Sequence, residues 1–440
     1  MTMRIACLGV LLSLCSSVPI LAESLSEALS ITGYVRHELA IRSSTPHEVT
    51  KAKTVVWLAG KYAVSPYLRL RLATRAFYDA VYDLTDTFPS HVARAQETEV
   101  SLQQALLELS SGPLDARLGL QHIVWGEAVG TFIADVVNPK DFREFVLPEF
   151  RDIRRPIWAL NMTYALSEGL VLEGVWTPHL RFHKLPRPGA EFAFAPTPLP
   201  AGVEVVLTPT HIPTMTLAHS QGGVRLSWLT DGWDLALFYF DAFDYFPTPF
   251  TRSTRRPTTG QPVITVAPRH TRLHILGATL SKALEPVVLR SEIVTTFDKF
   301  LRTSHQRHSD QVVRQHVVNA MIGLDYTLLN TVLTGIQVLQ YFVPGASAQV
   351  RDEQQRRGSV HTAFSIRLEA GLWDHTLVPQ VLFIMNTDRG DYRLSSRLLY
   401  HATSALTVTL GTDIFSGPQH TLYGQFAQRD RVYTEVSYQF

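Results

Sequence analysis

Residues 360–369 read VHTAFSIRLE, and side chains of two kinds alternate along this stretch. The two faces are Val360, Thr362, Phe364, Ile366 and Leu368 on one side and His361, Ala363, Ser365, Arg367 and Glu369 on the other. A period of two over about ten residues is typical of a membrane-spanning β-strand. We expect lipid to meet the first face and water to meet the second.

The same alternation recurs through the chain. Leu68, Leu70 and Leu72 stand opposite Arg69 and Arg71, and the chain ends on the row Val432, Thr434, Val436, Tyr438 and Phe440. The pattern predicts about eighteen strands, at 31–42, 52–63, 67–79, 97–109, 114–124, 156–165, 169–178, 222–229, 233–241, 269–280, 286–296, 313–326, 331–342, 359–369, 376–386, 391–401, 405–415 and 431–440. Spacers alternate between short and long, with 387–390 as the short exception.

These features predict an all-β chain that closes as a single antiparallel transmembrane β-barrel. No apolar run after residue 22 approaches the 18 residues of a membrane helix, and only helices and closed barrels satisfy the backbone in lipid. Short spacers are expected as periplasmic turns and long ones as outer loops, in the outer membrane of a diderm bacterium. A soluble propeller or sandwich is the alternative, but it would not require two classes of loop length.

The first residues have the layout of a signal peptide. Arg4 precedes an apolar run over residues 5–14, and a small-residue site ends at Ala22. We therefore expect a signal peptide at residues 1–22 and a mature barrel at residues 23–440. A lipoprotein anchor at Cys15 is the alternative, although the preceding Leu14 is larger than such a site prefers.

Composition excludes several classes of function. Cys7 and Cys15 both lie in the expected leader, so the mature chain has no disulfide and no cysteine-bound metal. Without Arg4, 39 basic residues balance 39 acidic ones, which gives no reason to expect nucleic acid as a partner. We expect neither a cofactor nor a metal ion.

The longest charged loop predicts the functional region. Residues 124–158 read VWGEAVGTFIADVVNPKDFREFVLPEFRDIRRPIW, with opposed charges and three prolines. Such a loop should be ordered, and we expect residues 125–155 to fold into the lumen and form its constriction, with the Pro-rich outer loop 179–221 as the alternative. The candidate residues are Trp125, Glu127, Asp135, Asn138, Asp141, Arg143, Arg154 and Arg155, with Arg117 and Arg225 of the lumen wall as partners for the loop carboxylates. A solvated outer loop, and arginines that only brace the wall, are the plainer interpretations.

This loop also carries a family resemblance. Trp125-Gly126-Glu127, then residues 135–141 (DVVNPKD), Arg143-Glu144-Phe145, Leu147-Pro148 and residues 154–158 resemble the hallmark of a large proteobacterial group of outer-membrane proteins, catalogued as a domain of unknown function. Residues 33–38, 75–79, 415–418 and 423–426 resemble it too, while Val129 stands where an acidic residue is expected. The resemblance implies a porin-like or export role, beside an inner-membrane exporter and a periplasmic carrier.

The sequence thus favours a channel or transporter for a small, anionic or amphiphilic solute, and not an enzyme. A structural or adhesive barrel is the main alternative, and an outer-membrane hydrolase is a weaker one because the G-x-S-x-G and H-E-x-x-H motifs are missing. Expected partners are outer-membrane lipid and lipopolysaccharide, and the barrel assembly machinery, which would recognise the terminal strand through Phe440.

Overall fold

The structure is a computed structural model that describes residues 29–195, 202–256, 258, 260–304, 310–329, 331–352, 356 and 358–440. The expected signal peptide at residues 1–22 lies outside these ranges. None of the helices in the described ranges is long and apolar enough to cross a membrane.

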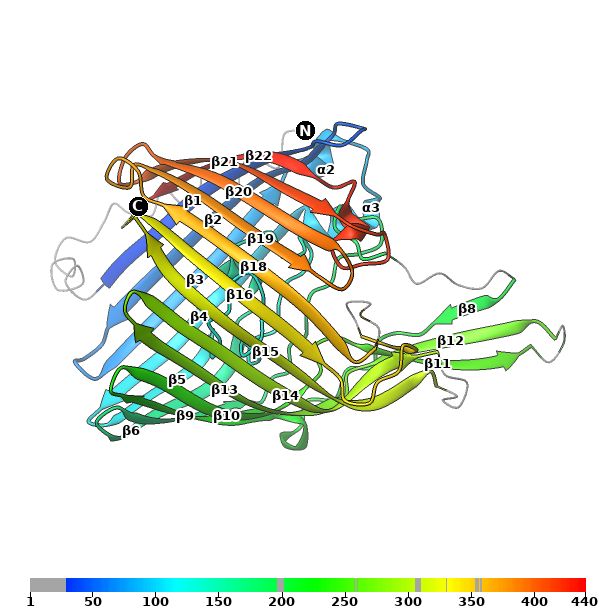
Figure 1. Cartoon of the computed structure of the whole chain (residues 1–440), viewed down its shortest axis with the longest axis horizontal. Coiled ribbons are helices and arrows are strands. Elements are labelled where there is room, and N and C mark those ends of the chain that lie inside the picture. The colour runs from blue at the N-terminus through cyan, green and yellow to red at the C-terminus, as the bar shows by residue number, and fades with distance from the viewer. Residues whose placement is uncertain are drawn as a thin grey trace, which may run out of the picture.

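Eighteen of the described strands form a closed antiparallel barrel (Figure 1). They are β1 (Leu29–Arg42), β2 (Val49–Ala63), β3 (Leu68–Asp79), β4 (Thr98–Ser111), β5 (Leu114–Gln121), β6 (Ile157–Ser167), β7 (Leu170–Thr177), β9 (Gln221–Thr230), β10 (Trp233–Phe243), β13 (Arg272–Leu284), β14 (Val287–Thr303), β15 (Val312–Leu328), β16 (Val332–Phe342), β18 (Val360–Ala370), β19 (Leu377–Asn386), β20 (Asp391–His401), β21 (Leu406–Ser416) and β22 (Arg431–Gln439). Each pairs with its neighbour in sequence, and β1 pairs with β22 to close the ring. The predicted barrel, its antiparallel order and its strand number are confirmed.

The inside and outside faces follow the alternation of the sequence. On β18, Val360 is 49% exposed on the outer surface while Ser365 is 2% exposed on the inner one. On β22, Val436 and Tyr438 are exposed outward and Tyr433 is buried. A barrel with an apolar exterior leaves no strand edge and satisfies its backbone within the ring, as lipid requires.

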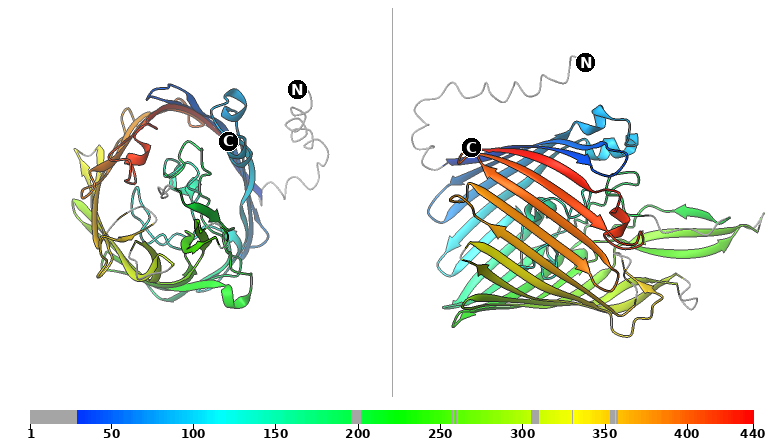
Figure 2. Two further views of the ribbon diagram at one scale, coloured as in Figure 1. Left: turned by 90° about the vertical axis from the view of Figure 1, so that its right-hand side faces the viewer. Right: turned by 45° about the horizontal axis from the view of Figure 1, so that its top comes forward.

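Short turns lie at one end of the barrel and long connections at the other (Figures 1 and 2). The start of β1 and the end of β22 are neighbours, since Tyr34 pairs with Gln439. Both lie at the end of the barrel that carries the short turns. This matches the predicted asymmetry between periplasmic turns and outer loops.

Besides the two-residue strand β17 (Val350–Arg351), three strands were not predicted. β8 (Glu204–Leu207), β11 (Thr248–Arg255) and β12 (Pro262–Arg269) form a separate sheet that projects beyond the outer end of the barrel (Figure 1). Prolines occur in β11 and β12, and proline normally argues against a strand. β14 also continues seven residues past its predicted end, because a bulge after Thr296 lets pairing with β15 resume at Lys299.

The remaining elements are short. They are α2 (Val81–Leu84), α3 (Ser90–Gln96), α4 (Phe150–Ile153), the single turns η1 (Leu217–His219) and η2 (Gly424–Phe426), and the two-residue strand β17 (Val350–Arg351) beside β14. Of these, α4 matters most for the site, since it lies in the loop between β5 and β6.

Candidate functional site

The loop between β5 and β6, residues 122–156, is here named the lumen segment. Apart from α4 and two isolated bridges it has no regular secondary structure, yet many of its side chains are buried. The view along the barrel in Figure 2 shows chain inside the ring of strands. The contacts below attach this segment to inward-facing residues of strands around the ring.

Trp125 anchors the start of the segment to β10. Its side chain is 2% exposed, with its ring centroid 5.2 Å from that of Phe238 and 5.8 Å from that of Phe240. Its indole N–H donates to Glu173 of β7 at 3.0 Å. Ala134 and Val137 join the same buried cluster. A large ring with one satisfied polar atom makes this an apolar anchor.

Glu292 of β14 organises the next turn of the segment. Its carboxylate accepts hydrogen bonds from the backbone N–H groups of Glu127, Ala128 and Ala134, the latter two at 2.8 Å. The Glu127 side chain itself is 49% exposed and lies 3.4 Å from Arg290. Gly126 is required here, because a Cβ at this position would lie 2.6 Å from the backbone nitrogen of Asp135. The buried carboxylate thus accepts the hydrogen bonds that regular secondary structure would otherwise provide for these backbone N–H groups.

Asp135, Asn138, Lys140 and Arg154 form a network within the segment. The Lys140 Nζ donates to the carbonyls of Asp135 and Asn138, at 3.0 and 2.5 Å. Arg154 Nε donates to Asp135 at 2.7 Å. Asn138 accepts from the N–H of Ile123 and donates to the carbonyl of Arg155, both at 2.8 Å. Burial lowers the pKa of Lys140, although Asp135 opposes this effect.

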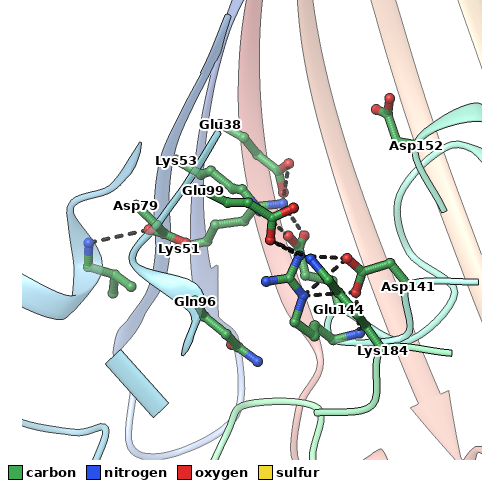
Figure 3. A network of polar contacts seen from close by, with 12 residues as sticks. Glu38, Lys51, Lys53, Asp79, Gln96, Glu99, Asp141, Glu144, Asp152 and Lys184 are labelled. Carbon is green, nitrogen blue, oxygen red and sulfur yellow. Dashed lines mark hydrogen bonds and ion pairs between the residues drawn. The ribbon is translucent and has the colours of Figure 1, made fainter. Parts of the chain in front are cut away.

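The next residues are bound to β2 and β4 (Figure 3). Glu144 accepts hydrogen bonds from the ammonium groups of Lys51, at 2.5 Å, and Lys53. Burial alone would raise the pKa of Glu144, but the two lysines hold it well below its usual value. Arg143 donates to Asp141 at 2.6 Å, and its Nη2 lies 2.8 Å from a Glu99 oxygen. These are charge-assisted contacts with little exposure to water.

Phe145 and Leu147 attach the segment to the part of the wall beyond the β1–β22 seam. Phe145 is 3% exposed, and its ring centroid lies 4.8 Å from that of Phe426 in η2. Leu147 belongs to the same cluster. On β20, Arg393 donates to the carbonyl of Val146 at 2.7 Å. The segment is therefore fixed on two regions of the ring, on β10 and β14 and on β2 and β20.

Two cavities remain between the segment and the wall near β1–β4. The outer cavity includes Lys51, Lys53, Phe77, Asp79 and Glu144 in its lining. The inner cavity, of ≈ 670 Å³, opens toward the short-turn end, and its lining includes Tyr34, Trp57, Gln103, Gln104 and His122. Arg75 and Asp152 line both cavities and so lie where the two approach each other.

The predicted wall partners were wrong. Arg117 is 54% exposed in its side chain, and its charged partner is Glu108 of β4, at 3.7 Å. Arg225 is paired in register with Glu173 of β7, and no ion pair links it to the lumen segment within the described ranges. The segment's carboxylates instead meet Arg36, Lys51, Lys53 and Arg290.

The other predicted residues hold the lumen segment folded or attach it to its surroundings. Trp125, Asp135, Asn138, Asp141, Arg143, Arg154 and Arg155 all form contacts that hold the segment folded or attached, and Arg155 donates to the carbonyl of Phe182. Glu127 is the most open of them. The sequence did not predict Arg36, Lys51 and Lys53 as partners of the segment. Their inward-facing positions on β1 and β2 could have indicated that they face the lumen.

The Pro-rich loop 179–221 divides into two parts. Its first part packs on the lumen segment, where the N–H of Lys140 donates to His183 and Phe192 joins the buried cluster of Phe145 and Leu147. Its later part contains β8 of the projecting sheet. Among the described residues, no cluster of three or more His, Cys, Asp or Glu side chains could hold a metal ion.

Comparison with known proteins identifies the family and the fold. The family described as "Protein of unknown function (DUF1302)" matches residues 53–440. Among curated protein sequences, none matches this chain.

Solved outer-membrane proteins share the architecture. Pseudomonas aeruginosa OccK8 (OprE) has a TM-score of 0.55 at 9% identity, covering 94% of this chain and 98% of that one. Acinetobacter baumannii OccAB2 has a TM-score of 0.54 at 10% identity, with coverage of 94% and 98%. P. aeruginosa OccK1 (OpdK) has a TM-score of 0.53 at 10% identity, with coverage of 94% and 99%. At such identities the likeness concerns the fold alone.

Proposed function

This chain belongs to the family described as "Protein of unknown function (DUF1302)" and is an outer-membrane β-barrel with the porin fold. We propose that it is a channel for small solutes and that the lumen segment narrows this channel. The observation that carries this proposal is the attachment of residues 122–156 to the inner wall on several sides, with cavities left beside β1–β4.

The width of the barrel supports a channel. A small eight-stranded barrel is filled by its own side chains, whereas barrels of about 16 to 18 strands leave an aqueous passage. Here the lumen segment occupies part of that space. Because it is bound through Glu292, Lys51, Lys53 and Arg393, it has little freedom to swing out of the barrel. A fixed constriction with charged walls favours selection by size and charge.

The lining of the inner cavity, with Arg75 and Arg151 against Asp152, supports a small anionic or amphiphilic solute. Both cavities include Arg75 in their lining, and the inner cavity adds the apolar rings of Tyr34 and Trp57. Export together with an inner-membrane exporter and a periplasmic carrier remains a proposal that rests on the family resemblance.

The test removes the acceptor that holds the segment on β14. In Glu292→Leu, the N–H groups of Glu127, Ala128 and Ala134 lose their acceptor, and the segment should loosen. Single-channel conductance in planar bilayers should then rise. Glu369→Leu on β18 is the matched control, because Glu369 bonds only to Arg367 and Gln380 in the hydrogen bonds of the described residues.

Two outcomes would contradict the proposal. Wild-type barrel that is folded but forms no channel at all would contradict the channel function. Equal conductance of wild type and Glu292→Leu would contradict the constriction by the lumen segment.

A second candidate function is adhesion through the projecting sheet. Leu207 on β8 is 70% exposed and Val206 is 41% exposed, beyond the outer end of the barrel. Apolar side chains displayed this way favour a surface contact. Deletion of the β11–β12 hairpin should abolish cell adhesion if this function exists, while conductance stays unchanged. Ester hydrolysis by the purified barrel would instead favour the hydrolase alternative.

A further inference from the structure

We propose that the inner cavity is a binding site for a small carboxylate that carries an aromatic ring, with Arg75 as the anion-binding residue and Trp57 as the ring-binding residue. The proposal rests on the channel function and names the chemistry of the solute and its site.

A row of three side chains crosses the wall at this level. Tyr34 of β1 is paired with Trp57 of β2, and Trp57 is paired with Arg75 of β3. Residues directly paired in an antiparallel sheet project from the same face. All three line the inner cavity, so the row faces the lumen. The barrel thus presents a ring, a second ring and a guanidinium side by side.

Arg75 is the cation of this row, and its buried Nε has no hydrogen-bond partner among the described residues. Its backbone carbonyl accepts from the Ser101 hydroxyl, but its side chain forms no hydrogen bond and no ion pair with any residue of the described ranges. Its guanidinium lies 5.5 Å from the centroid of the Phe77 ring, which supports one face of it. Since an arginine keeps its charge at all ordinary pH values, an unpaired guanidinium at a cavity favours an incoming carboxylate.

The nearest carboxylate is shared between two arginines, because the charge of Asp152 acts on both Arg36 and Arg75. Asp152 also lines the cavity, but its Oδ2 lies 2.6 Å from Nη2 of Arg36. Arg151, a further lining residue, is 62% exposed in its side chain and pairs with Glu149 at 3.3 Å. Two arginines, Arg75 and Arg151, and one carboxylate, Asp152, line the cavity, so the net charge of these three residues is positive.

The aromatic part of the solute is expected to contact Trp57. The Tyr34 and Trp57 rings stack with centroids 5.8 Å apart and an interplanar angle of 11°. Arg36 and Arg151 lie over Tyr34, at 5.6 and 5.5 Å from its centroid, so this ring is already covered. Trp57 is only half-buried and lines the cavity. An indole face beside a guanidinium suits a flat ring bearing a carboxylate.

The remaining lining suits a weak transport site. Gln103, Gln104 and His122 offer polar groups that can bind hydroxyl or carbonyl substituents. The volume of ≈ 670 Å³ lies within the range of small-molecule sites, about 300 to 1,000 Å³. A single cation gives modest affinity, which a channel needs if the solute is to leave again.

The test uses benzoate as the ligand and current through single barrels in planar bilayers as the measurement. We expect benzoate, added on the side of the short turns, to interrupt the wild-type current in a concentration-dependent way. In Arg75→Gln the apparent Kd should rise about 10-fold, the equivalent of about 1.4 kcal/mol. In Trp57→Leu the preference for benzoate over acetate should be lost. Arg117→Gln, which removes an exposed lumen arginine that does not line the cavity, is the control and should bind as wild type.

The outcomes separate this proposal from the channel function. Channels that conduct potassium chloride but show the same benzoate affinity in wild type and Arg75→Gln overturn the site and leave the channel intact. Absence of any conductance by folded barrel overturns the channel function. An equal loss of benzoate binding in Arg117→Gln overturns the assignment to Arg75. Heat modifiability of each variant on gels establishes that it is folded.

Discussion

Asp152 Oδ2 lies 2.6 Å from Nη2 of Arg36, and this ion pair joins the lumen segment to the first strand of the barrel. The two side chains are 7% and 13% exposed, so salt screens the pair only weakly. Burial alone would raise the pKa of Asp152, but Arg36 and Arg75 hold it below its usual value. The carboxylate is therefore charged at neutral pH, at the point where the two cavities approach each other.

We expect Asp152→Asn to make the channel more selective for anions. The substitution removes one negative charge from the neighbourhood of Arg36 and Arg75 and adds none. The reversal potential in a potassium chloride gradient measures this change and should shift toward that of chloride. Asp83→Asn, on the exposed outer helix α2, serves as the control. An identical reversal potential in Asp152→Asn and wild type would show that the passage lies elsewhere.

Stability should fall in acid partly because of His183. Its buried Nδ1 accepts the N–H of Lys140 at 2.7 Å, and burial together with the positive charge of Lys140 holds its pKa well below 6.5. Below pH 6.5, His183 therefore binds a proton in the unfolded chain but not in the folded barrel. The free energy of unfolding thus decreases as pH falls.

His183→Gln should reduce this slope by at most about 1.4 kcal/mol per pH unit, the value for one proton. Urea unfolding of the barrel in lipid vesicles at pH 7.5, 6.5 and 5.5 measures it. His122 and His270 also have lowered pKa values because they are buried, so some slope should remain. Parallel curves for the variant and wild type would contradict the role given to His183.

Charge should be tolerated on the lumen face and not on the lipid face. Leu72 is 57% exposed on the outer surface and is paired with Ala105, while the adjacent pair joins Ala73 to the lumen-lining Gln104. The two positions thus lie at nearly the same height. Leu72→Arg should cost about 2 to 4 kcal/mol if that height is near the bilayer midplane.

Gln104→Arg is the matched control, because its side chain meets the inner cavity of ≈ 670 Å³. Folding yield in lipid vesicles compares the two variants. Equal losses would mean that the inward and outward faces of β3 and β4 are assigned the wrong way round.

Loss of Phe440 should impair assembly. Its backbone N–H and carbonyl bond to Gly33 at 2.9 and 2.8 Å, which closes the seam of the barrel, and its ring lies on the outer surface at 56% exposure. Deletion removes both features, whereas Phe440→Ala keeps the backbone bonds. We expect the deletion to lower the amount of heat-modifiable barrel in the outer membrane most, and Phe440→Ala to lower it if the assembly machinery recognises the ring. Wild-type amounts in both variants would exclude a role for this residue.

The sequence by itself determined the barrel. Alternation between apolar and polar side chains is a local property, because successive residues of a strand project to opposite faces. Residues 360–369 could therefore be assigned an inside and an outside without knowledge of their neighbours. Turn residues and spacer lengths then determined the number of strands and the end at which each loop lies.

Only the tertiary structure decided which inward-facing residues meet the lumen segment. Glu144 contacts Lys51 and Lys53, which lie 93 and 91 residues earlier in the chain, whereas Arg117, expected as a partner, pairs with Glu108 on the adjacent strand. The alternation of side chains shows which residues face inward and which face outward. It does not give the height of a residue along the barrel axis or its angle around that axis. Those depend on register and on closure of the ring, which set the positions of Arg75 and Trp57 side by side and of Asp152 against Arg36.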